Sequence, residues 1–244
     1  MEVIIKMLCI LLCAGYATRM YPLTENFPKP LLQIKGKALI DYLIEDLEKG
    51  QYINEYVIVS NHKFISYFND WKNNHKVKNI TILDDGSISN ETRLGAVKDI
   101  EFAIESLNID EDILVLAGDN LLDFSLNCFI EYFNKKDSNC VMRYYENELT
   151  KLQRTGVATI AEDDRILEMI EKPKKPESNW AIPPFYIFKK EYLKQILKGI
   201  EFGCKTDSPG GLIEWFSRKN VVYAYLMPGK RIDIGNIDDY NKNK

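Results

Sequence analysis

The sequence has few of the residues that build several common kinds of site. It contains only two histidines, His62 and His75, and its five cysteines are scattered without a CxxC pair. This scarcity argues against a zinc site, and the cysteines are typical of reduced core residues in a cytosolic protein. No window of about eighteen apolar residues is present, so a membrane-spanning helix is not expected.

An excess of basic charge is also lacking. The 244 residues carry a formal net charge of -4, and the densest basic run, KPKKP at Lys172–Pro176, lies between Glu171 and Glu177. This balance argues against a nucleic-acid partner and against binding to an anionic membrane surface. With 45% hydrophobic and 28% charged residues, the chain can bury a sizeable core.

The start of the chain has an apolar centre followed by small residues, as a secretory signal peptide does. However, Glu2 cancels the charge of Lys6, the apolar run from Met7 is short, and Leu12 before Cys13 does not fit a lipoprotein box. A cytoplasmic location is therefore favoured.

Short apolar runs alternate with amphipathic segments through the first half of the chain. Strands are predicted at 7–13, 55–60 and 79–83, and within 112–120. Helices are predicted at 38–49, at the stripe of Phe64, Phe68 and Trp71, and at 93–107. This alternation is typical of a doubly wound α/β sheet, whose ligands bind at the carboxyl ends of the strands.

In the second half of the chain, most of the predicted elements are strands that follow one another closely. Strands are predicted at 140–145, 156–160, 166–170, 180–188 and 221–226, and a helix at 190–197. The spacing indicates hairpins, so we expect a small antiparallel lobe beside a Rossmann-like, mostly parallel sheet. No linker divides the chain, which predicts one domain with the substrate cleft between its halves.

The chain is organised around Leu11–Leu32, LLCAGYATRMYPLTENFPKPLL. The small residues of AGYA let backbone N–H groups approach phosphate oxygens, and Arg19 and Lys29 supply a planar and a point-like cation. The stretch lacks the GxxxxGK[ST] and GxGxxG fingerprints of other phosphate sites. From these residues alone, an ordinary strand, loop and helix junction stays the stronger alternative.

The same stretch resembles the signature of the nucleoside triphosphate transferases that make nucleotide sugars, L-A-[AG]-G-x-G-T-R-[LM]-x-P-L-T followed by P-K-P-L-L. Here the segment is L-C-A-G-Y-A-T-R-M-Y-P-L-T, with P-K-P-L-L after it. Cys13 and Ala17 depart from the pattern, and Ala17 is expected to be strained if its φ is positive. The resemblance covers about Met7 to Tyr240. It implies a GT-A-like nucleotidyltransferase fold, with a nucleotide-binding half at about 7–139 and an acceptor-binding half at about 140–244.

The resemblance assigns site residues motif by motif. It implies that Asp119 of GDN and Asp233 of IDIG bind Mg²⁺, which prefers carboxylate and phosphate oxygens. The implied catalytic cations are Arg19, Lys29 and Lys172. The implied nucleotide contacts are Leu12, Ala14, Gly15, Ala17, Thr18, Asp84, Asp85, Gly86 and Gly95. The implied acceptor contacts are Asn120, Gly156, Glu171, Lys172 and Asn179.

The implied reaction is attack of an acceptor phosphate oxygen on the α-phosphorus of a nucleoside triphosphate, with release of pyrophosphate. That oxygen is already anionic near neutral pH, because the second pKa of a phosphate monoester is about 6, so no general base is needed. We expect a sugar 1-phosphate as acceptor and CTP, UTP or dTTP as donor. A CTP-dependent enzyme with a phosphocholine-like acceptor stays open, as does a nucleotide-binding subunit without catalysis.

Two segments depart from the family pattern. The loop Asp84–Ala96 occupies the base-recognition region, and IPPFYIF at 182–188 carries two prolines that would stiffen the acceptor pocket. Because the chain ends soon after Tyr240, we expect a monomer or homodimer without the regulatory C-terminal helices of longer relatives. Residues 1–6 are expected to be an extension or a misassigned start.

Overall fold

The computed structural model describes residues 6–244, which form two compact units. The first unit combines the chain up to Leu94 with Leu116–Asn127 and Gly229–Lys244, and the second combines Gly95–Val115 with Cys128–Pro228. The extension expected at residues 1–6 lies, apart from Lys6, outside the described residues. Each unit therefore draws on segments that are far apart in the sequence.

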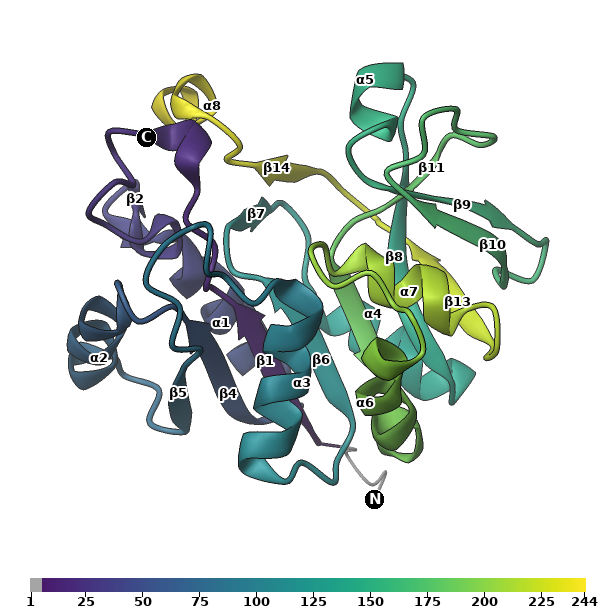
Figure 1. Cartoon of the computed structure of the whole chain (residues 1–244), viewed down its shortest axis with the longest axis horizontal. Helices are drawn as coiled ribbons and strands as arrows, with labels where there is room; N and C mark the ends of the chain where they lie inside the picture. Colours follow the sequence, from purple (N-terminus) through teal and green to yellow (C-terminus); the bar gives the residue numbers. More distant parts are fainter. Residues whose placement is uncertain (1–5) are drawn as a thin grey trace. The chain divides into compact units, whose positions relative to one another are not determined.

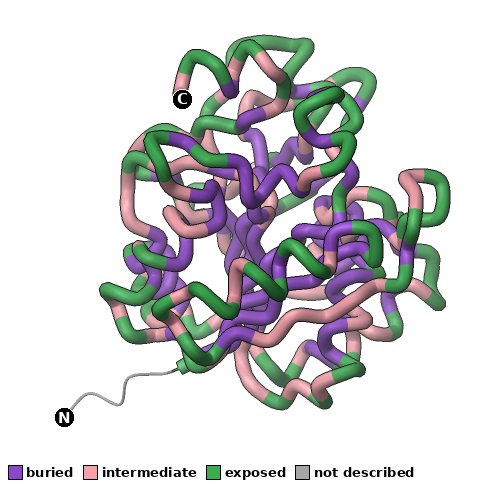
Figure 2. The backbone as a smooth tube through the Cα atoms, turned by 90° about the vertical axis from the view of Figure 1, so that its left-hand side faces the viewer, coloured by how far each residue is buried: buried purple, intermediate pink, exposed green. Residues whose placement is uncertain are grey.

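Three parallel strands lie side by side in the first unit, in the order β1-β4-β5 (Figure 1). They are β1 (Met7–Leu12), β4 (Ile53–Ser60) and β5 (Ile80–Asp84). The register pairs Ser60 with Asp84, so the polar side chains that end β4 and β5 lie at the same edge. Most residues of β1 and β4 are buried, which explains their continuous apolar runs. Figure 2 shows the buried stretches of the backbone in purple.

Two helices of the first unit match the predicted apolar stripes. In α1 (Leu39–Gly50) the three leucines of the stripe are buried, and the helix ends where Gln51 adopts a left-handed φ of 57°. In α2 (Ile65–Asn74) the Trp71 indole donates to Asp41 of α1 at 2.8 Å. This hydrogen bond links the two helices.

The other elements of the first unit are short. They are η1 (Thr18–Met20), η2 (Lys29–Leu31), β2 (Gln33–Ile34), β3 (Lys37–Ala38), β7 (Asn120–Leu122), β14 (Arg231–Asp233) and α8 (Ile237–Asn243). β6 (Ile113–Ala117) crosses the boundary between the units. β7 pairs antiparallel with β14, and this pairing brings the GDN and IDIG motifs together.

The sheet of the second unit has the order β10-β9-β11-β8-β12, with antiparallel neighbours, and β13 runs parallel to β8. Its strands are β8 (Asn139–Tyr145), β9 (Gly156–Ile160), β10 (Ile166–Glu171), β11 (Trp180–Ile182), β12 (Phe185–Phe188) and β13 (Val222–Leu226). The predicted antiparallel lobe is therefore confirmed.

The helical elements of the second unit are α3 (Ala96–Leu107), α4 (Asn127–Lys136), α5 (Leu149–Leu152), η3 (Lys190–Tyr192), α6 (Leu193–Glu201) and α7 (Gly210–Phe216). Asn127, the first residue of α4, belongs to the first unit. α7 packs on the hairpin of β9 and β10.

Several predicted elements have different bounds in the structure, and two of these differences have a clear physical cause. The helix expected from residue 93 begins at Ala96, because Gly95 before it has a φ of 95°. The strand expected at 180–188 is divided into β11 and β12, since Pro183 and Pro184 have no N–H groups to continue a ladder. Within residues 6–244, no helix has the length and apolar character needed to span a bilayer. The mixed α/β class predicted from the sequence is confirmed.

Candidate functional site

The turn after β1 has a strained backbone. Ala17 has φ 45° and ψ 43°, in the left-handed region that favours glycine, so the strain expected there is present. Thr24, which is wholly buried, donates from Oγ1 to the carbonyl oxygen of Ala17 at 2.8 Å. This hydrogen bond holds the turn. Thr24 ends the YPLT part of the motif, but sequence reasoning gave it no role.

The GDN loop passes close to the end of β1. A Cβ on Gly118 would lie 2.5 Å from Cys13 Sγ and 3.6 Å from Pro30 Cβ, and Gly118 N donates to the Leu12 carbonyl at 3.2 Å. A side chain at this position would push the three segments apart. Gly118 therefore allows Asp119 to reach the neighbourhood of the PKP segment.

Lys29 is buried between two carboxylates. Its Nζ lies 2.5 Å from Asp119 Oδ2 and 3.7 Å from Asp233 Oδ1. The Lys29 side chain is 8% exposed, whereas those of Asp119 and Asp233 are 30% and 48% exposed. The β7–β14 ladder creates this cluster, because Asn120, which follows Asp119, pairs with Asp233. Three of the predicted site residues are thus in contact.

Asn120 and Arg231 support the Asp119 carboxylate. The buried Asn120 donates from Nδ2 to Asp119 Oδ1 at 3.0 Å and accepts at Oδ1 from Arg231 Nη1 at 2.7 Å. Burial alone would raise the pKa of Asp119, but the charge and hydrogen bond of Lys29 outweigh it and lower the pKa. Asp119 is therefore ionised at neutral pH. The Asn120 amide, predicted to contact the acceptor, is already engaged within this cluster.

The donor set of this cluster fits a magnesium ion. Within the described residues, no group of three or more His, Cys, Asp or Glu side chains could hold a metal. Two carboxylates suffice for Mg²⁺, which commonly keeps several waters and takes its other ligands from substrate phosphates. Both carboxylates face the Lys29 ammonium, so they lie close enough together to share a second cation.

Arg19 lies on η1, and its side chain is exposed. In the part of the chain that the structure describes, it has no hydrogen-bond or ion-pair partner. The other nucleotide contacts implied for this turn precede Arg19 in the sequence: Leu12, Ala14, Gly15, Ala17 and Thr18. A free guanidinium on a turn of small residues is suited to an anionic ligand.

The loop that was predicted to recognise the base is attached to the opening turn. The Tyr16 hydroxyl donates to the Ser87 carbonyl at 2.9 Å, and Asn61 Nδ2 donates to the Ala14 carbonyl at 2.9 Å. The Ser87 carbonyl also accepts from His62 N at 2.9 Å. The two implied nucleotide-binding segments, the turn and this loop, therefore form one surface of the first unit.

The two carboxylates of this loop already accept hydrogen bonds. Asp84 Oδ1 accepts from Gly86 N at 2.9 Å, and its Oδ2 lies 2.6 Å from His62 Nδ1. Asp85 accepts from the amide and hydroxyl of Ser87 at 2.7 and 3.0 Å. Burial is the main cause that raises the pKa of Asp85. These bonds shape the loop, so a contact with a base would use the remaining lone pairs of the carboxylates.

Gly95, the last implied nucleotide contact, belongs to the second unit. A Cβ on it would lie 2.6 Å from the Thr206 carbonyl oxygen. The next two amides, of Ala96 and Val97, donate to the carbonyls of Asp207 and Thr206 at 3.4 and 3.1 Å. The glycine is thus required by this close approach of two backbone segments and by its φ of 95°.

Glu171 and Lys172 lie at the end of β10 in the second unit. The Glu171 side chain is 9% exposed and lies against glycine backbone, since a Cβ on Gly210 would collide with its carboxylate and one on Gly156 would lie 3.1 Å from Oε2. Burial raises the pKa of Glu171, although the Lys172 charge opposes the shift. Lys172 has a φ of 50° and donates from Nζ to Ser208 Oγ at 2.5 Å. Gly210 and Ser208 were not predicted.

Asn179 serves the fold through its amide nitrogen. Nδ2 donates to the Glu146 carbonyl at 2.7 Å, and Glu146 N donates to the Asn179 carbonyl at 2.9 Å. These bonds join the segment before β11 to the end of β8. The implied sugar contact of Asn179 would therefore involve its side-chain oxygen.

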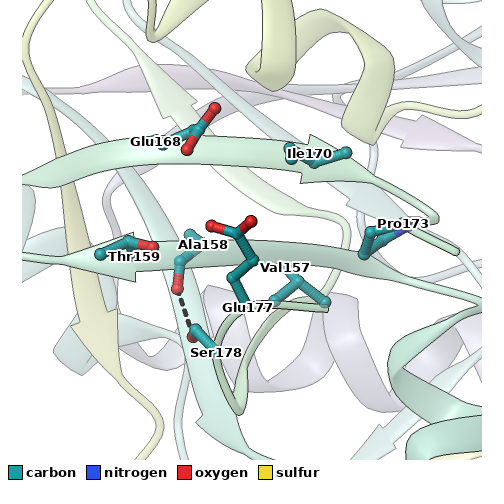
Figure 3. A pocket seen from close by; sticks show the side chains of 8 residues that line it. All are labelled: Val157, Ala158, Thr159, Glu168, Ile170, Pro173, Glu177 and Ser178. Carbon is teal, nitrogen blue, oxygen red and sulfur yellow. Dashed lines mark hydrogen bonds between the residues drawn. The ribbon is translucent and has the colours of Figure 1, made fainter. Parts of the chain in front are cut away.

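A pocket lies against the β9–β10 hairpin (Figure 3). Its lining residues are Val157, Ala158, Thr159, Glu168, Ile170, Pro173, Glu177 and Ser178. Side chains alternate along a strand, so Val157 and Ile170 point away from the face that carries Gly156 and Glu171. None of the implied acceptor residues lines this pocket.

Comparison with known proteins places these features in a family. Residues 8–244 match the family model described as Nucleotidyl transferase. A Sulfolobus acidocaldarius protein described as a mannose-1-phosphate guanyltransferase is 33% identical over 77% of this chain and 50% of its own length. The glucose-1-phosphate adenylyltransferase of Fervidobacterium nodosum is 29% identical over 95% of this chain and 59% of its own. The chain thus spans about half the length of these curated relatives.

Solved structures share the fold. A UDP-glucose pyrophosphorylase in complex with UDP-glucose superposes with a TM-score of 0.81, covering 98% of this chain and 97% of its own at 21% identity. A glucose-1-phosphate thymidylyltransferase from Bacillus anthracis gives a TM-score of 0.79 at 20% identity, covering 97% of this chain and 93% of its own. At this identity, the likeness concerns the fold alone.

Proposed function

The chain belongs to the nucleotidyl transferase family, and from that premise we propose that it transfers a nucleoside monophosphate unit from a nucleoside triphosphate to a sugar 1-phosphate. The products are an NDP-sugar and pyrophosphate. The observation that carries this proposal is the cluster of Lys29 with Asp119 and Asp233. The same unit bears Arg19, which has no ion-pair partner among residues 6–244. Such a cluster combines carboxylates for a metal with cations for phosphate.

In the proposed reaction, an oxygen of the acceptor phosphate attacks the α-phosphorus, and the bond from the α-phosphorus to the bridging oxygen of pyrophosphate breaks. The attacking oxygen is anionic above about pH 6, so no protein base takes a proton. Arg19 and Lys29 stabilise charge on the triphosphate and the departing pyrophosphate. Asp119 and Asp233 would hold Mg²⁺, which would supply further charge neutralisation at the phosphate oxygens.

The acceptor is assigned to the end of β10. Lys172 would bind the acceptor phosphate, and the Glu171 carboxylate would accept hydrogen bonds from sugar hydroxyls. The Gly156 backbone and the Asn179 side-chain oxygen would line the same site. Glu171 and Lys172 are adjacent residues, and Gly156 is the ladder partner of Glu171, which supports a shared role.

The names of the relatives favour a sugar acceptor over a phosphocholine-like one. Those described above act, by name, on mannose 1-phosphate and glucose 1-phosphate. Their names cite guanyl and adenylyl transfer, and the solved structures are of thymidylyl and uridylyl enzymes. The donor base therefore has to be measured, with CTP, UTP and dTTP as the first candidates and GTP and ATP beside them.

The test measures pyrophosphate release by the purified chain with Mg²⁺. Each of the five triphosphates is paired with glucose 1-phosphate, mannose 1-phosphate, N-acetylglucosamine 1-phosphate and phosphocholine. We expect turnover with at least one sugar 1-phosphate and none for the Asp119→Asn variant. Turnover with phosphocholine alone would contradict the proposed acceptor, and an active Asp119→Asn variant would contradict the metal assignment.

Two further expectations accompany this function. We propose a cytoplasmic location, which is supported by the five cysteines, since all of them are free thiols in the structure. We also propose a monomer or homodimer as the assembly. Size-exclusion chromatography with light scattering measures the second expectation directly, and a tetramer would contradict it.

A further inference from the structure

Glu214 is a carboxylate on α7 that belongs to none of the predicted motifs, yet it is 8% exposed. Its Oε1 accepts from Arg218 Nη2 at 2.8 Å. Its Oε2 accepts from Lys205 Nζ at 3.0 Å and from the backbone amide of Glu171 at 3.1 Å. A buried carboxylate of this kind connects α7 to the last residue of β10.

Lys205 and Arg218 do not by themselves account for the burial of the Glu214 carboxylate. The side chains of Lys205 and Arg218 are 64% and 62% exposed, and ion pairs with exposed cations contribute little. The Glu171 amide differs, because the side chain of its residue is largely buried and an N–H shielded from water needs an acceptor. Burial would raise the pKa of Glu214, but this amide and Lys205 outweigh it and lower the pKa.

The main chain at Glu171 and Lys172 is held from two directions. Glu171 N donates to Glu214, and Lys172 N donates to the Thr155 carbonyl at 3.1 Å. Lys172 has a φ of 50°, which a residue with a side chain rarely adopts unless its surroundings enforce it. The Glu171 side chain meanwhile lies against Gly210, at the start of the helix that carries Glu214.

We propose that Glu214 is the positioning residue of the acceptor site, because its carboxylate fixes the backbone from which Glu171 and Lys172 project. The inference rests on the proposed function, which assigns these two residues to the acceptor. Glu214 acts through the amide of Glu171 and takes no part in the chemistry. One helix thereby sets both the backbone and the side chain of Glu171.

Three variants separate this role from a general effect on stability. Glu214→Ala removes the acceptor of the Glu171 amide, whereas Glu214→Gln keeps an oxygen for that amide and removes the charge. The matched control is Asp46→Ala in the first unit. Asp46 also accepts a backbone amide, from Leu126 at 2.7 Å, but it touches none of the implied acceptor residues.

The first measurement is hydrogen exchange, which needs no substrate. In Glu214→Ala, the amide of Glu171 should exchange at least about tenfold faster than in the unaltered chain, since a hydrogen bond to a charged group is lost. Glu214→Gln should keep much of the protection, and Asp46→Ala should leave Glu171 unchanged. Unchanged protection in Glu214→Ala would overturn the proposal.

The second measurement is the KM of each substrate, determined with the sugar 1-phosphate and triphosphate that the unaltered chain uses best. Glu214→Ala should raise the KM of the sugar 1-phosphate about tenfold or more and leave that of the triphosphate within about twofold, because only the acceptor site is altered. Glu214→Gln should restore most of the loss. Asp46→Ala should lower the melting temperature without changing either KM.

The outcomes separate the two proposals. An unaltered chain without turnover on any acceptor would overturn the proposed function and, with it, the positioning role. Turnover with an unchanged acceptor KM in Glu214→Ala would overturn the positioning role alone, even if exchange at Glu171 increased. If Glu214→Ala does not fold, Glu214→Asp decides, because it keeps the charge on a side chain one methylene shorter and so draws the carboxylate away from the Glu171 amide: an unchanged acceptor KM would contradict the proposal.

Discussion

The two charged clusters of the molecule are built in opposite ways. In the first unit, the cation is buried and the carboxylates are accessible: Lys29 is 8% exposed, between Asp119 and Asp233. In the second unit, the carboxylates of Glu171 and Glu214 are buried, and the cations that face them are exposed. The first cluster therefore exposes negative charge to solvent, and the second exposes positive charge.

This difference matches the ligands that the two clusters are proposed to bind. Accessible carboxylates can bind a hydrated metal ion, while a buried lysine keeps them close together before the metal arrives. An exposed Lys172 can meet an acceptor phosphate, while a buried Glu171 offers its oxygens only to a group that displaces water. The proposed metal and triphosphate site thus buries its cation, whereas the proposed sugar phosphate site buries its carboxylates.

The largest effects are expected when Lys29 of the first cluster and Lys172 of the second are replaced in turn. Lys29→Met leaves two carboxylates facing each other without a cation, so kcat/KM should fall about 10²–10³-fold and stability by about 1–3 kcal/mol. Lys172→Met should raise the KM of the acceptor about tenfold, with little change in stability, because exposed ion pairs contribute little.

Steady-state kinetics and urea unfolding measure both effects. The two variants are matched, since each replaces an ammonium by a side chain of similar length. Equal losses of stability in Lys29→Met and Lys172→Met would contradict the difference in burial on which the comparison depends.

A smaller effect is expected from Gly210→Ala. The new Cβ would collide with the Glu171 carboxylate, which is the far end of a flexible side chain and can move away. The melting temperature should therefore change little, while the KM of the sugar 1-phosphate rises about five- to tenfold from loss of one hydrogen bond. A large loss of stability with an unchanged KM would indicate that Glu171 serves the fold and not the acceptor.

The pH dependence of stability should have opposite signs in the two clusters. The pKa of Asp119 is lowered, so its ionised form stabilises the fold above its unfolded pKa of about 3.9, and this contribution is lost as the pH falls through the folded value. The pKa of Glu171 is raised, so its ionisation costs stability as the pH rises from about 4.3 through the folded value.

Thermal unfolding of Asp119→Asn and Glu171→Gln between pH 3 and about pH 8 tests this contrast. Asp119→Asn should be less stable than the unaltered chain near neutral pH and approach it below about pH 4. Glu171→Gln should gain stability near neutral pH and lose that gain in acid. The same sign for both differences would contradict the assigned pKa directions.

Sequence patterns predicted the fold class because apolar periodicity determines which faces of strands and helices are buried. The roles of Lys29, Asp119 and Asp233 came from the family resemblance, because each lies in a short motif of that family. Sequence patterns could not identify Thr24 or Glu214, whose roles depend on contacts between distant segments.

The left-handed conformation of Lys172 could not be predicted from the sequence either, since glycine is the residue type that most often indicates a positive φ. Ala17 was the exception, because a glycine is usual at its position in the family motif. The predictable part of the site is therefore its chemistry, and the unpredicted part is the set of contacts that hold the chemistry in place.

The smallest effect is expected for Ala17→Gly, which tests how the turn after β1 is supported. A left-handed alanine costs about 1 kcal/mol relative to glycine, but glycine also gains about 0.4–1 kcal/mol of freedom in the unfolded chain. The net change in the free energy of unfolding should be within about 0.5 kcal/mol of zero. Lys35→Gly is the matched control, because Lys35 has a φ of 51° outside the candidate site.

Urea unfolding of both variants should give the same small change. Ala17 differs from Lys35 in accepting the Thr24 hydrogen bond, which constrains the turn even when its residue is glycine. A loss of more than about 1 kcal/mol of unfolding free energy in Ala17→Gly alone would mean that the alanine methyl group, and not Thr24, holds the turn after β1 in its left-handed form.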